Sequence, residues 1–175
     1  VPAVAVVLGE AHDVKLADLK ITECRGVGLA ILGQVELVNL LIARNRSGIS
    51  AYGDAQVILR NSQVFGHTVG GVRLYGLAQL TLRSSQVFSN WLAGLWLVGG
   101  QLIIAEDCWI SDNECGIWMP KGRQIQIKGQ NNWVKYNFVD FYSCTPPEGF
   151  LRETPPQPLL LEVKVGPAGN FSELS

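Results

Sequence analysis

The chain has 175 residues, of which 47% are hydrophobic and 17% are charged, and its formal net charge is -1. This length and composition are those of a single folded domain and exclude disorder over most of the chain, because low hydropathy and high net charge are both missing. The balanced charges provide no excess of Lys and Arg for a nucleic acid, and no run of about 18 apolar residues predicts a membrane span, so we expect neither partner.

Short apolar segments recur along the chain at a nearly constant interval. The first, Val4–Gly9, predicts the last strand of an incomplete repeat. Segments with apolar residues two apart then begin at positions 14, 35, 57, 80, 102 and 125. Each repeat holds two further segments in the same register, for example Leu40/Ile42 and Ile49/Ala51 in the second repeat. Because apolar residues two apart indicate a strand with one buried face, each repeat predicts three short strands.

A column of polar residues keeps the same phase after the second strand of each repeat. It consists of Asn45, His67, Asn90, Asn113 and Asn137, with His67 as the one departure from Asn. An Asn side chain at a sharp bend can hydrogen-bond to a neighbouring repeat, and Asn tolerates a left-handed backbone. We therefore expect these residues to form a ladder at a bend of the stacked repeats.

Three short strands in about 22 residues cannot bury a core alone, but stacked repeats bury a continuous one. The sequence therefore predicts an all-β fold over residues 1–144, a parallel β-helix of about six coils with three short strands per coil. Residues 145–175 predict a Pro-rich, extended tail with one strand at Leu159–Val165. We expect this tail to cover the last coil, or to pack along an aromatic stripe of its own chain or of a partner.

Three segments in the same phase carry a resemblance to a known family. Asn61–His67, Ser84–Asn90 and Glu106–Asn113 resemble the repeat of right-handed parallel β-helix proteins, the pectin-lyase-like superfamily. The resemblance extends over residues 14–141 and implies a right-handed coil. It implies no single activity, because that fold occurs in lyases, hydrolases, adhesins and phage spikes. The sequence leaves the compartment unknown, and the resemblance favours a location outside the cytoplasm or at the cell surface.

Enzymes of that superfamily use clustered or paired carboxylates, which the outward positions of the first strands lack. These positions are expected to form two columns with one carboxylate between them: Lys15, Glu36, Ile58, Thr81, Ile103 and Gln126, and Ala17, Val38, Arg60, Arg83, Ala105 and Lys128. Gly66-His67-Thr68 resembles a glycosidase Gly-His-Gly triplet, but no pair of aspartates accompanies it. We therefore expect a non-catalytic protein without a cofactor, and a polysaccharide lyase or hydrolase is the least favoured reading.

The four cysteines, Cys24, Cys108, Cys115 and Cys144, do not have the paired spacing of a structural zinc site. We therefore expect no metal. Buried thiols and a disulfide both stay open as readings of these residues.

Large aromatic residues occupy outward positions at the same phase of successive repeats. The candidate interface or ligand-binding residues are Tyr52, Tyr75, Trp96, Trp118, Phe65, Phe88, Trp109 and Trp133. A monomer seldom exposes contiguous apolar stripes. We therefore predict a structural or assembly module of a larger surface or repeat protein, which forms a homo-oligomer (a dimer or trimer) through these stripes. The alternative is a carbohydrate-binding module that stacks the sugar rings of a polysaccharide on its Tyr and Trp side chains.

Overall fold

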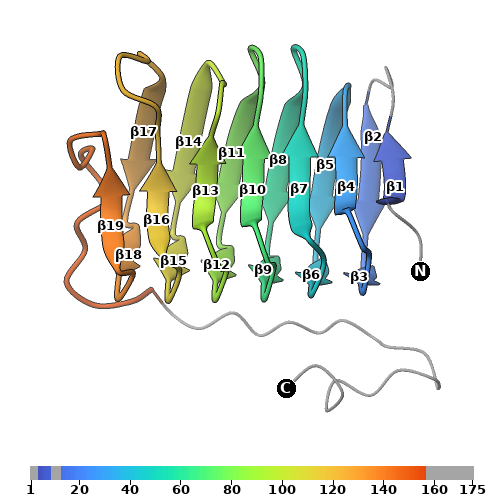
Figure 1. The fold of residues 1–175 in the computed structure, drawn as a ribbon, viewed down its shortest axis with the longest axis horizontal. Coiled ribbons are helices and arrows are strands. Elements are labelled where there is room, and N and C mark those ends of the chain that lie inside the picture. Colours follow the sequence, from blue (N-terminus) through green and yellow to red (C-terminus); the bar gives the residue numbers. More distant parts are fainter. Residues whose placement is uncertain (1–3, 9–12, 157–175) are drawn as a thin grey trace.

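The computed structural model describes residues 4–8 and 13–156, in which the chain winds into a solenoid of stacked coils (Figure 1). Nineteen strands in these ranges form three parallel sheets. Six full coils begin with β2, β5, β8, β11, β14 and β17, and each contributes one strand to every sheet. The predicted all-β fold of about six coils, with three short strands per coil, is confirmed. As predicted, β1 precedes the full coils as the last strand of an incomplete one, paired with β4.

Each sheet collects the strands from one side of the solenoid. Sheet A contains β1 (Val4–Leu8), β4 (Val27–Ile31), β7 (Ser47–Ala51), β10 (Gly70–Leu74), β13 (Ala93–Leu97), β16 (Cys115–Trp118) and β19 (Val139–Tyr142). Sheet B contains β2 (Val14–Ala17), β5 (Gln34–Val38), β8 (Gln56–Arg60), β11 (Gln79–Arg83), β14 (Leu102–Glu106) and β17 (Gln126–Gln130). Sheet C contains β3 (Lys20–Thr22), β6 (Leu41–Ala43), β9 (Gln63–Phe65), β12 (Gln86–Phe88), β15 (Trp109–Ser111) and β18 (Trp133–Lys135). Among the described residues, no helix is long and apolar enough to cross a bilayer.

The core is a continuous column of apolar side chains enclosed by the three sheets. In sheet B, for example, Leu37, Leu59 and Leu82 are register partners on successive strands, and all three are fully buried. Parallel strands stack about 4.8 Å apart, so each inward side chain lies directly on its counterpart in the next coil. The core therefore extends through the coils without a break, as the repeat predicts.

The last two coils differ from the register expected from the sequence. Ile103, predicted to point outward, is fully buried, and Glu106 takes an outward place in β14. In the sixth coil Ile127, and not Ile125, continues the inward column. Residues Leu102–Ala105 are all apolar, so alternation could not indicate which of them face the core. A shift of one residue exchanges the two faces of a strand, and this changes which carboxylates lie outside.

The Asn ladder forms at the corner where sheet C leads into sheet A. The Asn90 Oδ1 accepts a hydrogen bond from the backbone N–H of His67 at 3.2 Å, and the Asn113 Oδ1 accepts one from the backbone N–H of Asn90 at 3.0 Å. The predicted ladder is thus confirmed. The left-handed backbone lies one residue earlier than predicted, for example at Ser89 (φ 54°) and Asp112 (φ 55°). The ladder amides satisfy buried backbone groups at this bend.

Phe150 closes the core at the sixth coil. Its side chain is fully buried and its ring lies against Gly129, in the inward column of sheet B. The Gly149 carbonyl accepts a hydrogen bond from the backbone N–H of Asn132 at 2.9 Å. Leu151 then forms an antiparallel bridge with Trp133. The strand predicted at Leu159–Val165 lies outside the described residues.

Candidate functional site

The eight aromatic residues singled out from the sequence form four contacting pairs on the outer faces. The pairs are Tyr52–Tyr75 and Phe65–Phe88, stacked at centroid distances of 4.9 and 4.8 Å, and Trp96–Trp118 and Trp109–Trp133, edge to face at 5.6 and 5.7 Å. Trp133 is buried and the other seven are half-buried, so these side chains are less exposed than the predicted stripes. Their role as an interface or ligand site stays a prediction.

Two further residues join two of these pairs into one continuous surface on sheet A. The Arg73 guanidinium lies over the rings of Tyr75 and Trp96, 5.2 and 4.8 Å from their centroids. Tyr142 stacks on Trp118 at 6.1 Å, with the ring planes 3° apart. We call this surface the aromatic ridge: Tyr52, Tyr75, Arg73, Trp96, Trp118 and Tyr142. Arg73 and Tyr142 have the same phase as the two Trp residues, and this is the signal that could have added them to the candidates.

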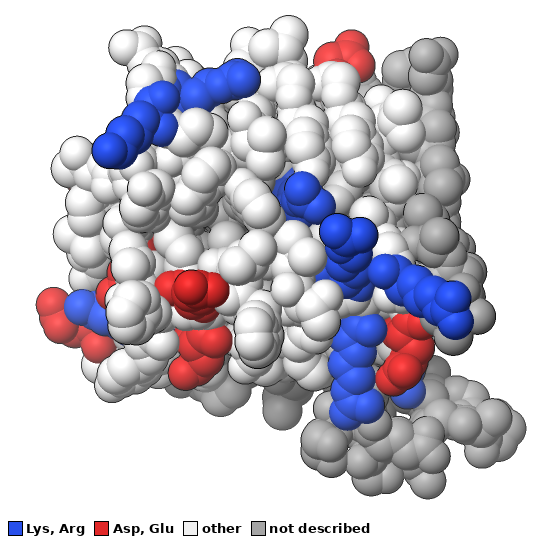
Figure 2. All heavy atoms as spheres, viewed as in Figure 1, with Lys and Arg blue, Asp and Glu red and all other residues white. Residues whose placement is uncertain are grey.

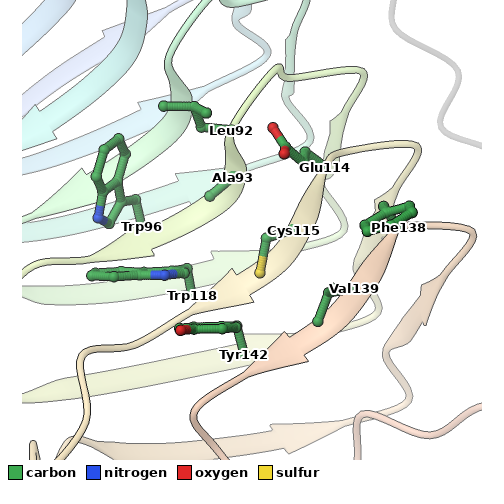
Figure 3. Close-up of a pocket in the computed structure, with 9 residues that line it drawn as sticks. All are labelled: Leu92, Ala93, Trp96, Glu114, Cys115, Trp118, Phe138, Val139 and Tyr142. Carbon is green, nitrogen blue, oxygen red and sulfur yellow. The ribbon is translucent and has the colours of Figure 1, made fainter.

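A groove of about 370 Å³ lies beside the ridge over the last three coils (Figure 3). Its floor consists of Ala93, Cys115 and Val139, which are register partners on β13, β16 and β19. The ridge residues Trp96, Trp118 and Tyr142 form one wall, and Leu92, Glu114 and Phe138 form the other. The groove exists because the side chains of the floor row are smaller than those of the two rows that border it. Its lining is apolar apart from Glu114 and the polar atoms of the aromatic side chains.

Two of the three most exposed large apolar side chains of the described residues lie at the outer edge of the groove, whereas the third, Tyr136, packs its ring against Trp133. Phe138 is 89% exposed and Trp91 is 75% exposed, and Leu92 lies beside Trp91 at 41%. These three residues, which we call the apolar corner, were not among the predicted site residues. Two residues, Trp91 and Leu92, separate the ladder residue Asn90 from β13, whereas only Phe138 separates Asn137 from β19. Trp91 is thus the first residue of a two-residue connection, and Phe138 is the single residue of a shorter one.

The aromatic pairs on sheet C have a different environment. The Trp109 Nε1–H donates a hydrogen bond to the carbonyl of Pro156 at 3.1 Å. Trp133 contacts the ring of Tyr136 and forms a bridge with Leu151, which leaves it 8% exposed. These two Trp residues are thus covered by the chain itself, whereas the groove on sheet A is open.

His67 occupies the place of an Asn in the ladder and is fully buried. Its Nδ1 accepts a hydrogen bond from the backbone N–H of Asn45 at 3.1 Å, so its Nε2–H donates to the carbonyl of Ile42 at 3.1 Å. The neutral imidazole thereby reproduces the acceptor and donor of an Asn amide. Burial lowers the pKa of His67 to about 4, although the nearby backbone groups of Asn45 and Ile42 act in the opposite direction. This position supports the structural interpretation of Gly66-His67-Thr68.

The outer face of sheet B carries more carboxylates than the sequence register predicted. Glu36 pairs with Arg60 at 3.0 Å, and Glu106 pairs with Arg83 at 3.3 Å. The two glutamates lie in the second and fifth coils, about 14 Å apart along the stack, which exceeds the separation of the carboxylates in most glycosidases. Among the described residues, no three His, Cys, Asp or Glu side chains are grouped closely enough to hold a metal ion.

The four cysteines all carry free thiols. Burial raises the pKa of the Cys108 thiol to about 12 and that of Cys115, on the floor of the groove, to about 11. A thiol with such a pKa is a poor nucleophile at neutral pH, because the thiolate is the reactive form. Cys115 therefore acts in the groove as a small apolar residue.

The comparison with known protein families agrees with this architecture. Residues 4–145 match the family described as the right-handed beta helix region, and the match includes every strand named above. The comparisons with curated proteins and with solved structures give no match. With six coils, three parallel sheets and a match over most of its length, the chain belongs to the right-handed β-helix family.

Proposed function

We propose that this chain is a non-catalytic β-helix module that associates with a second copy of itself through the groove side of sheet A. The observation that carries the proposal is the apolar corner beside an open, apolar groove. Exposed apolar groups grouped beside a groove are typical of protein interfaces. Figure 2 supports this choice, since much of the face that carries sheet A is free of charged side chains.

The exposed side chains are large enough to drive association. An aromatic side chain buries 150–250 Å² in a core or interface, which at about 25 cal/mol per Å² is on the order of 3 kcal/mol for a residue as exposed as Trp91 or Phe138. The ridge residues contribute less new burial, because Trp118 and Tyr142 already cover one face of each other. The corner therefore provides the main contacts of the proposed interface, and the ridge provides its shape.

Carbohydrate binding is the second candidate, because Trp96, Trp118 and Tyr142 line the groove. A sugar ring packs its C–H face on the face of an aromatic ring. Trp118 and Tyr142 are nearly parallel and stack on each other along the ridge, so each has one face directed at its neighbour. Glu114 is the one charged residue that lines this groove. The geometry thus favours self-association over a sugar platform.

The test is the mass in solution, measured by size-exclusion chromatography with multi-angle light scattering over a range of concentrations. The wild-type mass should rise from 19.1 kDa towards twice that value as the concentration increases. Trp91→Ser and Phe138→Ser should each shift the transition to higher concentration. Leu77→Ser is the matched control, because Leu77 is 62% exposed between β10 and β11, at another corner.

A wild-type protein that stays monomeric at every concentration would overturn the proposal. An equal effect of Leu77→Ser would show that the association is nonspecific. Titration with soluble plant and bacterial polysaccharides, with Trp118→Ala as the control, tests the second candidate. Incubation with pectin-like polymers in the presence of calcium tests for lyase or hydrolase activity, and release of oligosaccharides would contradict the non-catalytic assignment.

A further inference from the structure

The corner between sheets C and A has a different charge at each end. In the first and second coils Arg25 and Arg46 are exposed, and the one carboxylate of this end, Glu23, pairs with Arg44 at 3.7 Å. In the fifth coil Asp112 and Glu114 are exposed. The apolar residues Trp91 and Leu92 lie between these ends, in the fourth coil. Figure 2 shows this distribution on the lower part of the sheet A face, with mainly acidic side chains towards the β19 end and mainly basic ones towards the β1 end.

We propose that two copies of the chain pack by this corner as an antiparallel, two-fold symmetric dimer. This inference rests on the proposed self-association and specifies its geometry. A two-fold axis perpendicular to the solenoid, between the third and fourth coils, places the second coil of one copy opposite the fifth coil of the other. Arg46 then faces Glu114 of the partner subunit, and the symmetry repeats this contact on the other side of the axis.

The same operation matches the remaining parts of the corner. Trp91 and Leu92 of the fourth coil lie opposite Thr68 and Val69 of the partner's third coil, which are uncharged. At about 4.8 Å per coil, the fourth coil is only about 2.4 Å from the axis along the stack, so the Trp91 side chains of both copies meet at the centre of the contact. The exposed aromatic residue is thus placed where interface hot spots gather.

At the ends of the contact, the first coil lies opposite the sixth. Arg25 then faces the highly exposed Phe138 of the partner subunit, and a guanidinium over an aromatic face is favourable. A parallel side-by-side arrangement would instead place Arg46 beside Arg46 and Glu114 beside Glu114. Like charges in contact oppose association, so the charge distribution selects the antiparallel arrangement.

The charges are expected to set orientation, and the apolar residues to provide affinity. Pairs of exposed charges contribute about 0–1 kcal/mol each, whereas juxtaposed like charges weaken an interface strongly. Reversing one charge of the pair should therefore have a larger effect than removing it. Because the dimer is symmetric, each single substitution alters two contacts.

Charge reversal tests the arrangement on the full chain. Glu114→Arg and Arg46→Glu should each raise the concentration at which dimers form by about tenfold or more at low salt. The double variant, with both changes, should restore dimer formation to near the wild-type concentration. Arg123→Glu is the control, because Arg123 is exposed between β16 and β17, away from this corner. Circular dichroism during heating checks that every variant folds.

The outcomes separate the two proposals. A monomeric wild-type chain overturns both the self-association and its geometry. A dimeric wild-type chain whose single variants are unaffected, or whose double variant is not restored, overturns the antiparallel arrangement alone. Restoration in the double variant, together with an unchanged Arg123→Glu control, establishes the contact between Arg46 and Glu114 of the partner subunit. High salt should reduce the difference between the single variants and the wild type, because it screens exposed charges.

Discussion

Replacing His67 by Asn should remove a pH dependence of stability that the wild-type chain shows in mildly acidic solution. The neutral imidazole acts as an amide in the ladder, with Nδ1 as acceptor and Nε2–H as donor. Protonation places a second N–H opposite the backbone N–H of Asn45, and it places a charge in a fully buried site. An Asn at this position has the same donor and acceptor but does not titrate.

The magnitude follows from the pKa of His67, which burial lowers from 6.5 to about 4 in the folded chain. Between these values the unfolded chain binds more protons than the folded one, so stability falls as the pH falls. The contribution is complete above the unfolded pKa and is lost below about pH 4. A difference of this size amounts to about 3 kcal/mol in total, of which about 2 kcal/mol is lost between about pH 7 and about pH 5.

Urea unfolding followed by tryptophan fluorescence measures this difference. The free energy of unfolding of the wild type should fall between about pH 7 and about pH 5 by about 2 kcal/mol more than that of His67→Asn. The comparison between the two proteins cancels the contribution of the other titrating groups. An equal loss in both proteins would refute the reasoning, since it would mean that His67 titrates alike in the folded and unfolded chains.

Three other predictions follow from the core. Gly71→Ala should destabilise the chain by about 2 kcal/mol in thermal melts, because its Cβ would lie 2.7 Å from the Gly94 carbonyl oxygen, whereas Gly70→Ala should be tolerated, since the nearest contact there is an ordinary 3.4 Å. Phe150→Ala should reduce the free energy of urea unfolding by about 3–5 kcal/mol, and a smaller loss would contradict its role in closing the core. Cys108 should react with a thiol reagent only on unfolding, because it is buried and its pKa is raised to about 12; rapid labelling of the folded chain, mapped by mass spectrometry, would disprove this.

The sequence predicts the fold well because its repeat is regular at the buried positions. Alternating pairs such as Val35 and Leu37 give both the strand and its inward face, and the Asn column gives the phase of each corner. Where the alternation fails, at Leu102–Ala105, the register fails with it. The register of a strand can thus be predicted only where neighbouring residues differ clearly in hydrophobicity.

The candidate site is less predictable, because it depends on exposure and ring orientation. The phase of Trp96 and Trp118 predicts that they are neighbours, and they are in contact. It does not predict that Tyr142 covers a face of Trp118, or that Trp91 projects from the corner. A pattern of buried positions contains little information about the outward side chains, because many residue types are tolerated there.

The closure at Phe150 has a consequence for how copies of the chain can join. An open end of a β-solenoid presents unpaired strand edges, which can template the addition of another molecule and lead to fibres. Here the backbone of Gly149 and Arg152 takes up both hydrogen-bonding groups of Asn132, and the direction of the chain at Leu151 is opposite to that of a further coil. End-to-end polymerisation is therefore blocked where this segment lies, and growth of the molecule into filaments from that end would require it to detach first.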